Sequence, residues 1–131
     1  MDPAIGITGV DFVSAPTEDL DRSVAFYGAT LGLECSVHMP DLGYAEFETG
    51  NVTINVFHAK TMGLEFAPNP SLMALHVPDV AAARSQLEAT GVEFSGPTID
   101  TGVCHMASFR DPDGNGLMLH HRYAPRMPRG D

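Results

Sequence analysis

Three polar side chains are candidates for proton transfer or ligand recognition. His76 and His120 lie in otherwise apolar segments, and Glu46 lies in a segment where apolar and polar residues alternate. Histidine titrates near neutral pH and a carboxylate accepts protons, so each residue is a candidate general acid or base. Each also has a structural interpretation, because histidines at strand ends often only pack and strand glutamates are usually solvated. The residues alone leave both interpretations open.

An internal duplication predicts the elements that position these side chains. "FVSAPTEDLDRSVAFYGATLGLE" begins at Phe12, and "LMALHVPDVAAARSQLEATGVEF" begins at Leu72. Both contain a short apolar run, an Asp that can cap a helix, a helical stretch and a Gly that can end it. The predicted caps are Asp19 and Asp79. The sequence therefore encodes two copies of one structural plan.

Three strand-like segments follow each predicted helix. In the first copy they cover residues 33–39, 43–49 and 51–58, and in the second they are "VEFSG", "CHMASF" and "GLMLHH". The pattern predicts an α+β fold of two tandem βαβββ modules that form a curved mixed sheet around a cup. We expect a single domain over 1–131, with module 1 at about 5–58, a linker at about 59–70, module 2 at about 71–123 and a loose tail at 124–131.

Composition narrows the classes of function. The chain has 131 residues, of which 44% are hydrophobic, so it is long enough for one domain with a core. Its formal charge of −10 repels phosphate backbones and argues against nucleic acid as a partner. It contains no apolar run of about 20 residues, and its beginning lacks the features of a signal peptide. We expect a cytoplasmic protein that does not enter membranes.

The duplication, the segment "DLDRSVAFYGATLGLE" and the turn "DPDGN" together resemble the vicinal oxygen chelate superfamily. This superfamily includes glyoxalase I, extradiol dioxygenases and bleomycin-resistance proteins. In its metal-dependent members, His or Glu side chains from the first and last strand of each module hold a divalent ion in the cup. The positions that match here carry Phe12, Asn55, Leu72 and Met118.

These four side chains predict that the chain lacks the metal site of the superfamily that it resembles. Phe and Leu have no lone pair, Met binds soft metals weakly, and one Asn carbonyl does not hold a divalent ion against water. A site rebuilt from His76, His120 and Glu46 would need a new geometry and is disfavoured. We therefore expect neither a metal nor another cofactor.

Strand alternation predicts which side chains line the cup, because residues two apart share one face. The candidate catalytic residues are His76, His120 and Glu46. The candidate ligand-binding residues are Phe12, Ser14, Tyr44, Thr53, Asn55, Phe57, Leu72 and Met118.

Two classes of function agree with this lining. The first is a metal-independent binding protein that resembles bleomycin-resistance proteins and binds a hydrophobic small molecule, such as a natural product or antibiotic. The second is a metal-independent isomerase, cyclase or lyase in which a His or Glu is the general acid or base. The resemblance also implies a homodimer. The residues favour binding slightly, because no nucleophile–base pair is recognisable.

Overall fold

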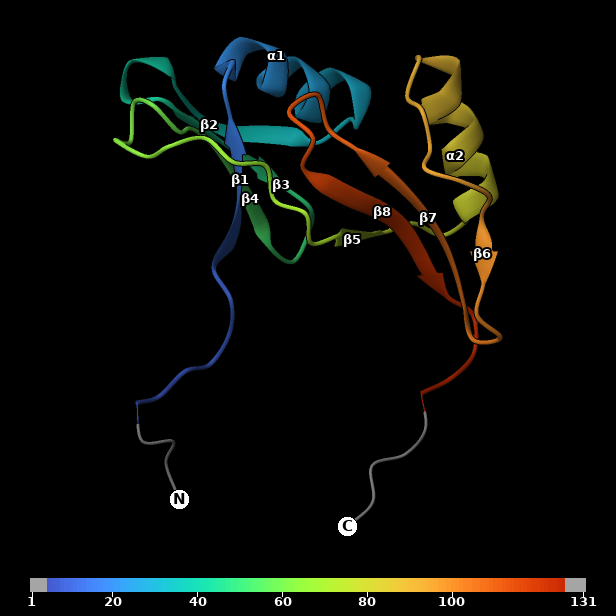
Figure 1. Ribbon diagram of the computed structural model, residues 1–131. Coiled ribbons are helices and arrows are strands. Elements are labelled where there is room, and N and C mark those ends of the chain that lie inside the picture. Colours follow the sequence, from blue (N-terminus) through green and yellow to red (C-terminus); the bar gives the residue numbers. More distant parts are fainter. Residues whose placement is uncertain (1–4, 127–131) are drawn as a thin grey trace. The chain divides into compact units, whose positions relative to one another are not determined.

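The computed structural model describes residues 5–126, which divide into two compact units between Phe66 and Ala67. Unit 1 contains β1 (Phe12–Thr17), α1 (Leu20–Ala25), a π-helical stretch (Phe26–Thr30), β2 (Glu34–Met39), a 3-10 turn (Pro40–Leu42), β3 (Tyr44–Glu48) and β4 (Thr53–His58). Unit 2 contains β5 (Met73–His76), α2 (Val80–Ala89), β6 (Ile99–Asp100), β7 (Cys104–Arg110) and β8 (Gly116–Arg122) (Figure 1). The predicted α+β class with two tandem βαβββ modules is confirmed.

The two units have the same sheet topology. The strand order is β1-β4-β3-β2 in unit 1 and β5-β8-β7-β6 in unit 2. In each unit the first strand runs parallel to the last, and the remaining pairs are antiparallel. The helix is the crossover that a parallel pair requires. The enclosure of a common cup by the two sheets stays a prediction.

Both predicted helix starts are confirmed. Asp19 Oδ1 accepts a hydrogen bond from the backbone N–H of Arg22 at 3.1 Å, and Asp79 Oδ1 accepts one from Ala82 at 3.0 Å. Each Asp has an extended backbone and satisfies one of the N–H groups that a helix start leaves without a partner. Gly91, with φ of +96°, adopts the left-handed conformation that ends α2 at low steric cost.

Aromatic and aliphatic side chains fill the core of each unit. In unit 1, Tyr27 is fully buried and its ring lies 5.8 Å from that of Phe47, between centroids. Ile54 and Val56 of β4 are buried on the same side. In unit 2, the corresponding core contains Leu87, Ala107, Phe109, Leu117 and Leu119. In both units the helix therefore covers one face of a four-stranded sheet.

The DPDGN segment forms the tight turn between β7 and β8. Asp111 Oδ1 accepts hydrogen bonds from the backbone N–H groups of Asp113 and Asn115, and Asp111 Oδ2 accepts one from the Asn115 side chain at 2.8 Å. Asn115 Oδ1 in turn accepts a hydrogen bond from the backbone N–H of Asn69. Asp111 and Asn115 are both buried. The most recognisable motif of the sequence therefore stabilises the fold of unit 2.

The prediction of a strand at "VEFSG" is wrong. Only Phe94 in this segment makes a β-bridge, to Phe109, and the strand of this part of the sheet is β6. Gly96 has a φ of +141° and is followed by a proline, which lacks a backbone donor. The chain therefore leaves the edge of β7 after Ser95, whose backbone N–H still donates to the Ser108 carbonyl at 2.8 Å, and pairs with β7 again at Ile99.

Two other expectations concern the ends of the modules. The division between the units falls inside the predicted linker at 59–70. Of the predicted tail, residues 127–131 lie outside the described part, whereas Ala124 donates a backbone hydrogen bond to Val103 at 3.2 Å. Among the described residues, no helix has the length and apolar character needed to cross a bilayer.

Candidate functional site

Seven of the eleven predicted site residues belong to unit 1. Burial alternates along its strands: Ala45 and Phe47 of β3 are buried against the helix, while Tyr44, Glu46 and Glu48 between them are half-buried. The same alternation occurs along β4. The helix-free face of unit 1 is accordingly made by Phe12, Ser14, Tyr44, Glu46, Glu48, Thr53, Asn55 and Phe57. Burial agrees with the alternation on which the predicted site residues were chosen, and the binding of a ligand by this face stays a prediction.

Strand register arranges this helix-free face in rows that cross the sheet. The central row contains Ser14, Asn55, Glu46 and Val37, from β1, β4, β3 and β2. On one side lies the row of Phe12, Thr53, Glu48 and Glu34, and on the other the row of Pro16, Phe57, Tyr44 and Met39. Residues that face each other in neighbouring strands have Cβ atoms about 5 Å apart. A small molecule over the central row can therefore also contact the side chains of β3 and β4 in the adjacent rows.

The two glutamates of β3 differ in their hydrogen bonding. Glu48 accepts hydrogen bonds from the hydroxyls of Ser36 and Thr53, the latter at 2.7 Å. The bond from Ser36 and then that from Thr53 hold the pKa of the Glu48 carboxyl below its ordinary value. Among residues 5–126, no hydrogen bond or ion pair involves the side chain of Glu46. Glu46, which the sequence identified, is therefore the carboxylate available to a ligand.

The remaining predicted residues belong to unit 2. Met118 of β8 faces Ala74 and Ser108 in the neighbouring strands, and His120 faces His76 and Met106. Leu72 precedes β5 and is 47% exposed. The helix-free face of unit 2 thus combines thioether, methyl and imidazole groups around Met118.

The ring of His76 is closer to a histidine that the sequence did not single out. Its centroid lies 5.7 Å from that of His121, the residue after His120. His121 faces His105 across the β7–β8 pair, and its Nδ1 is buried without a hydrogen-bond partner in the described part of the chain. His76 and His120 are thus brought opposite each other in backbone register, with the His76 ring beside His121.

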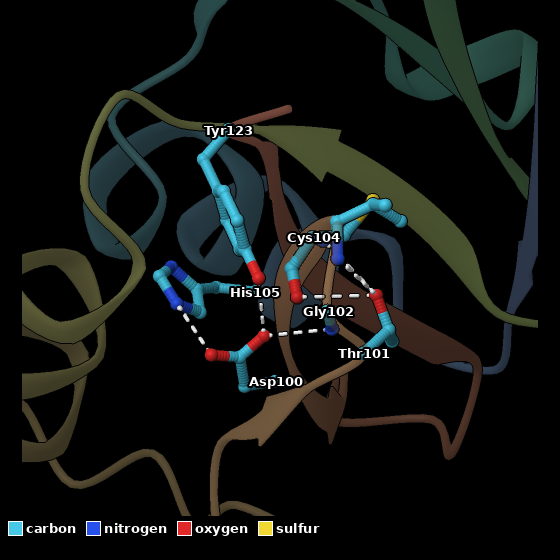
Figure 2. A network of polar contacts seen from close by, with 7 residues as sticks. Asp100, Thr101, Gly102, Cys104, His105 and Tyr123 are labelled. Carbon is cyan, nitrogen blue, oxygen red and sulfur yellow. Dashed lines mark hydrogen bonds and ion pairs between the residues drawn. The ribbon is translucent and has the colours of Figure 1, made fainter. Parts of the chain in front are cut away.

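A polar network at the edge of unit 2 was not predicted (Figure 2). Tyr123 donates to Asp100 Oδ1 at 2.8 Å, and His105 Nε2 lies 3.5 Å from Asp100 Oδ2. Hydrogen bonds from the backbone N–H of Gly102 and, to a smaller extent, from the Tyr123 hydroxyl lower the pKa of the Asp100 carboxyl. The hydrogen bond to Asp100 raises the pKa of Tyr123. Tyr123 follows Asp100 by 23 positions, so no short-range sequence pattern predicts this contact.

A separate pocket of about 370 Å³ lies in unit 1, at the start of α1. Its lining includes the acidic residues Glu18, Asp19 and Asp21 together with His58, whose Nδ1 lies 2.7 Å from the Thr61 hydroxyl. None of the predicted site residues lines this pocket. Within the described residues, no group of three or more His, Cys, Asp or Glu side chains is arranged to hold a metal ion.

Solved structures show the same fold in several proteins. A protein from Bacillus anthracis assigned to the glyoxalase family has a TM-score of 0.76 and 22% identity, over 88% of this chain and 96% of its own. A glyoxalase/bleomycin resistance protein/dioxygenase from Nocardioides has a TM-score of 0.75 and 25% identity, over 95% and 89%. TnmS3, an antibiotic binding protein from Streptomyces sp. CB03234, has a TM-score of 0.73 and 23% identity, over 88% and 97%.

The sequence agrees with this structural similarity, although no match was found among curated proteins. The profile of the Glyoxalase/Bleomycin resistance protein/Dioxygenase superfamily matches residues 9–119, which extend from before β1 into β8 and so cover nearly all of both copies of the βαβββ unit. Because the match extends over most of the chain and the topology is repeated in both units, this chain belongs to the glyoxalase/bleomycin resistance protein/dioxygenase superfamily.

Proposed function

We propose that the chain is a metal-independent small-molecule-binding protein whose ligand is hydrophobic and contacts the helix-free faces of the sheets. The observation that carries the proposal is the chemistry of four positions. Phe12, Asn55, Leu72 and Met118 occupy the places where metal-dependent relatives are expected to have His or Glu. Three of these side chains favour a carbon-rich guest over a divalent ion.

Exposure of large apolar side chains supports the same proposal. Phe12, the first residue of β1, is 55% exposed, and Leu72, just before β5, is 47% exposed. Exposed apolar groups next to half-buried polar groups are typical of surfaces that receive a ligand. The antibiotic binding activity named for TnmS3 makes a natural product a reasonable ligand class, although the likeness itself concerns only the fold.

A second candidate function is a metal-independent isomerase, cyclase or lyase. It is favoured by Glu46, a half-buried carboxylate whose side chain has no partner within the described residues. Such a group is suited to accept a proton from a bound substrate, and His76 or His120 would then return it. The difference from the first function is whether the small molecule leaves unchanged.

We also propose that the protein acts as a homodimer in the cytoplasm. β2 forms one edge of the sheet of unit 1, and five of its six residues are exposed. A sheet edge with unpaired backbone groups pairs readily with another strand, and proteins often cover it through a symmetric contact.

One experiment separates the two functions. The protein is incubated with a library of natural products, and native mass spectrometry identifies the compounds that remain bound. Each bound compound is then released and analysed by chromatography and mass spectrometry. Unchanged compounds support binding, whereas a new product whose formation requires the protein supports catalysis. If no compound binds above the level seen with a heat-unfolded control, the proposed function is wrong.

A further inference from the structure

The central row of the helix-free face of unit 1 differs from its neighbour in hydrogen bonding. In the neighbouring row, Glu48 is held by Ser36 and Thr53, so its acceptor oxygens are already engaged. In the central row, the side chains of Glu46 and Asn55 make no hydrogen bond to any residue between 5 and 126. Both are half-buried. Half-buried polar groups that lack a partner gain free energy when a ligand supplies one.

Glu46 and Asn55 are placed to act on a single ligand group. They face each other in the antiparallel β3–β4 pair, which sets their Cβ atoms about 5 Å apart. An ionised glutamate only accepts hydrogen bonds, whereas an asparagine amide both accepts and donates. Together they offer a carboxylate and a carbonyl to a ligand that donates at least two hydrogen bonds. A nitrogen group with several N–H donors meets this requirement.

The surroundings of the pair favour a ligand group that is also positively charged. Glu48 contributes a second negative charge on the same strand, because the hydrogen bonds from Ser36 and Thr53 favour its ionised form. Tyr44 and Phe57 face each other in the adjacent row, and aromatic faces attract cations. The formal charge of −10 adds a long-range attraction for cations.

Building on the proposed function, we infer that Glu46 and Asn55 form a recognition pair for a cationic nitrogen group, such as an ammonium or amidinium, on an otherwise apolar ligand. The carboxylate of Glu46 supplies the charge-assisted hydrogen bond, and Asn55 accepts a second one. The remaining carbon skeleton contacts apolar residues of the helix-free face of unit 1, such as Phe57. The pair thereby selects among hydrophobic molecules by charge.

Two aromatic probes of similar size and different charge test this inference. 9-Aminoacridine is cationic at pH 7, and acridone is neutral. Binding of each is measured by fluorescence anisotropy at low and high salt. The wild-type protein should bind 9-aminoacridine at least about tenfold more tightly than acridone, since a charge-assisted hydrogen bond is stronger than a neutral one. The preference should decrease at high salt.

Variants assign the preference to the pair. Glu46→Gln should weaken 9-aminoacridine binding by about tenfold and leave acridone binding within about twofold. Asn55→Leu should weaken 9-aminoacridine binding by a smaller factor. Glu34→Gln is the matched control, because it removes the same charge from an exposed position of β2, outside the central row. It should change neither affinity by more than about twofold. Thermal unfolding of each variant verifies that it is folded.

The outcomes distinguish this inference from the proposed function. If acridone binds as tightly as 9-aminoacridine, or if Glu46→Gln affects both probes equally, the recognition pair is wrong and the binding function stands. If Glu34→Gln weakens 9-aminoacridine binding as much as Glu46→Gln does, the preference for the cationic probe comes from the overall charge of the protein. The inferred recognition pair is then also wrong. If neither probe binds, both the proposed binding of hydrophobic molecules and the inferred pair are contradicted.

Discussion

Asn115 Oδ1 accepts a hydrogen bond of 2.8 Å from the backbone N–H of Asn69, a residue 46 positions earlier. Asn115 is only 3% exposed, and its amide also donates to Asp111. One buried side chain thus joins the β7–β8 turn to the segment that leads into β5. Gly116 donates a further backbone hydrogen bond to the Asn69 carbonyl at 2.9 Å.

Replacing Asn115 should therefore destabilise unit 2. Asn115→Ala removes the acceptor of the Asn69 N–H and the amide that donates to Asp111 Oδ2, and we expect a loss of about 2–3 kcal/mol in the free energy of unfolding. Urea unfolding followed by circular dichroism measures it. Asn69→Ala is the control, since it retains the backbone donor, and should cost less than about 1 kcal/mol. Equal losses in the two variants would contradict the role assigned to the Asn115 side chain.

Met118 should influence the affinity for a neutral ligand more strongly than His76. Met118→Glu introduces a carboxylate on the helix-free face of unit 2, where we propose that the carbon skeleton lies, and such a charge is costly to desolvate. We expect at least about tenfold weaker binding of acridone, measured by calorimetry, and less than about threefold for His76→Ala. A larger effect of His76→Ala would favour a site centred on the histidines.

The enzymatic alternative makes a different prediction for the same residues. If a compound is converted, His76→Ala or Glu46→Gln should lower turnover by about a hundredfold or more, while a neutral substrate still binds within about tenfold. Product formation is followed by mass spectrometry. Glu34→Gln serves as the control, because it removes a carboxylate from the edge strand. Turnover that is unaffected by both variants would exclude these residues as the general acid or base.

Protein purified without a chelator should carry no stoichiometric zinc, iron, nickel or manganese. The side chains of Phe12, Leu72 and Met118 do not supply hard or borderline donors for these ions. Elemental analysis checks this, with a chelator-treated sample as the reference. A metal content of about one ion per chain that is lost in His76→Ala or His120→Ala would overturn the prediction.

Stability should depend on pH through Tyr123 and Asp100. The pKa of Tyr123 is raised above its ordinary value of 10.0, so its bond stabilises the folded state below that pH and is lost as pH rises through the folded pKa. The pKa of Asp100 is lowered below 3.8, so its stabilisation is present above that value and is lost as pH falls through the folded pKa.

Tyr123→Phe isolates this contribution, because it removes the hydroxyl and retains the ring that stacks on His105. The difference in unfolding free energy from wild type should be constant between about pH 5 and 9 and shrink outside that window. Tyr44→Phe is the matched control, since no hydrogen bond of the Tyr44 hydroxyl is found in residues 5–126. A difference that does not change above pH 10 would show that the bond to Asp100 does not stabilise the fold.

Assembly is tested by light scattering at micromolar concentration. We expect the mass of a homodimer, because β2 presents an exposed edge of the unit 1 sheet. A monomer at this concentration would contradict the proposed dimer.

Local patterns were sufficient to predict most of the fold. The caps at Asp19 and Asp79 depend on side chains that bond three residues ahead, and the faces of β3 and β4 follow from alternation over five or six residues. Both kinds of information are contained in short windows of sequence. The repeat then indicated that the same topology occurs twice.

Longer-range contacts and backbone conformations were not predictable in this way. The positive φ of Gly96 interrupts the segment "VEFSG", where a strand was predicted, and the strand in this part of the sheet is β6 instead. The bond between Asp100 and Tyr123 depends on where two separated segments meet. Likewise, alternation along β3 places Glu46 and Glu48 on the same face, but only the structure distinguishes the carboxylate that is already hydrogen-bonded from the one that is not.

Three strands of each unit pair in the same register, so each residue of one sheet has an equivalent position in the other. The side chains at these equivalent positions differ in their chemistry. The positions of Ser14, Asn55 and Glu46 in unit 1 correspond to those of Ala74, Met118 and Ser108 in unit 2. Glu48 likewise corresponds to Arg110. The helix-free face of unit 1 is therefore acidic, whereas that of unit 2 carries thioether and imidazole groups, so the two faces favour ligand groups of different chemistry.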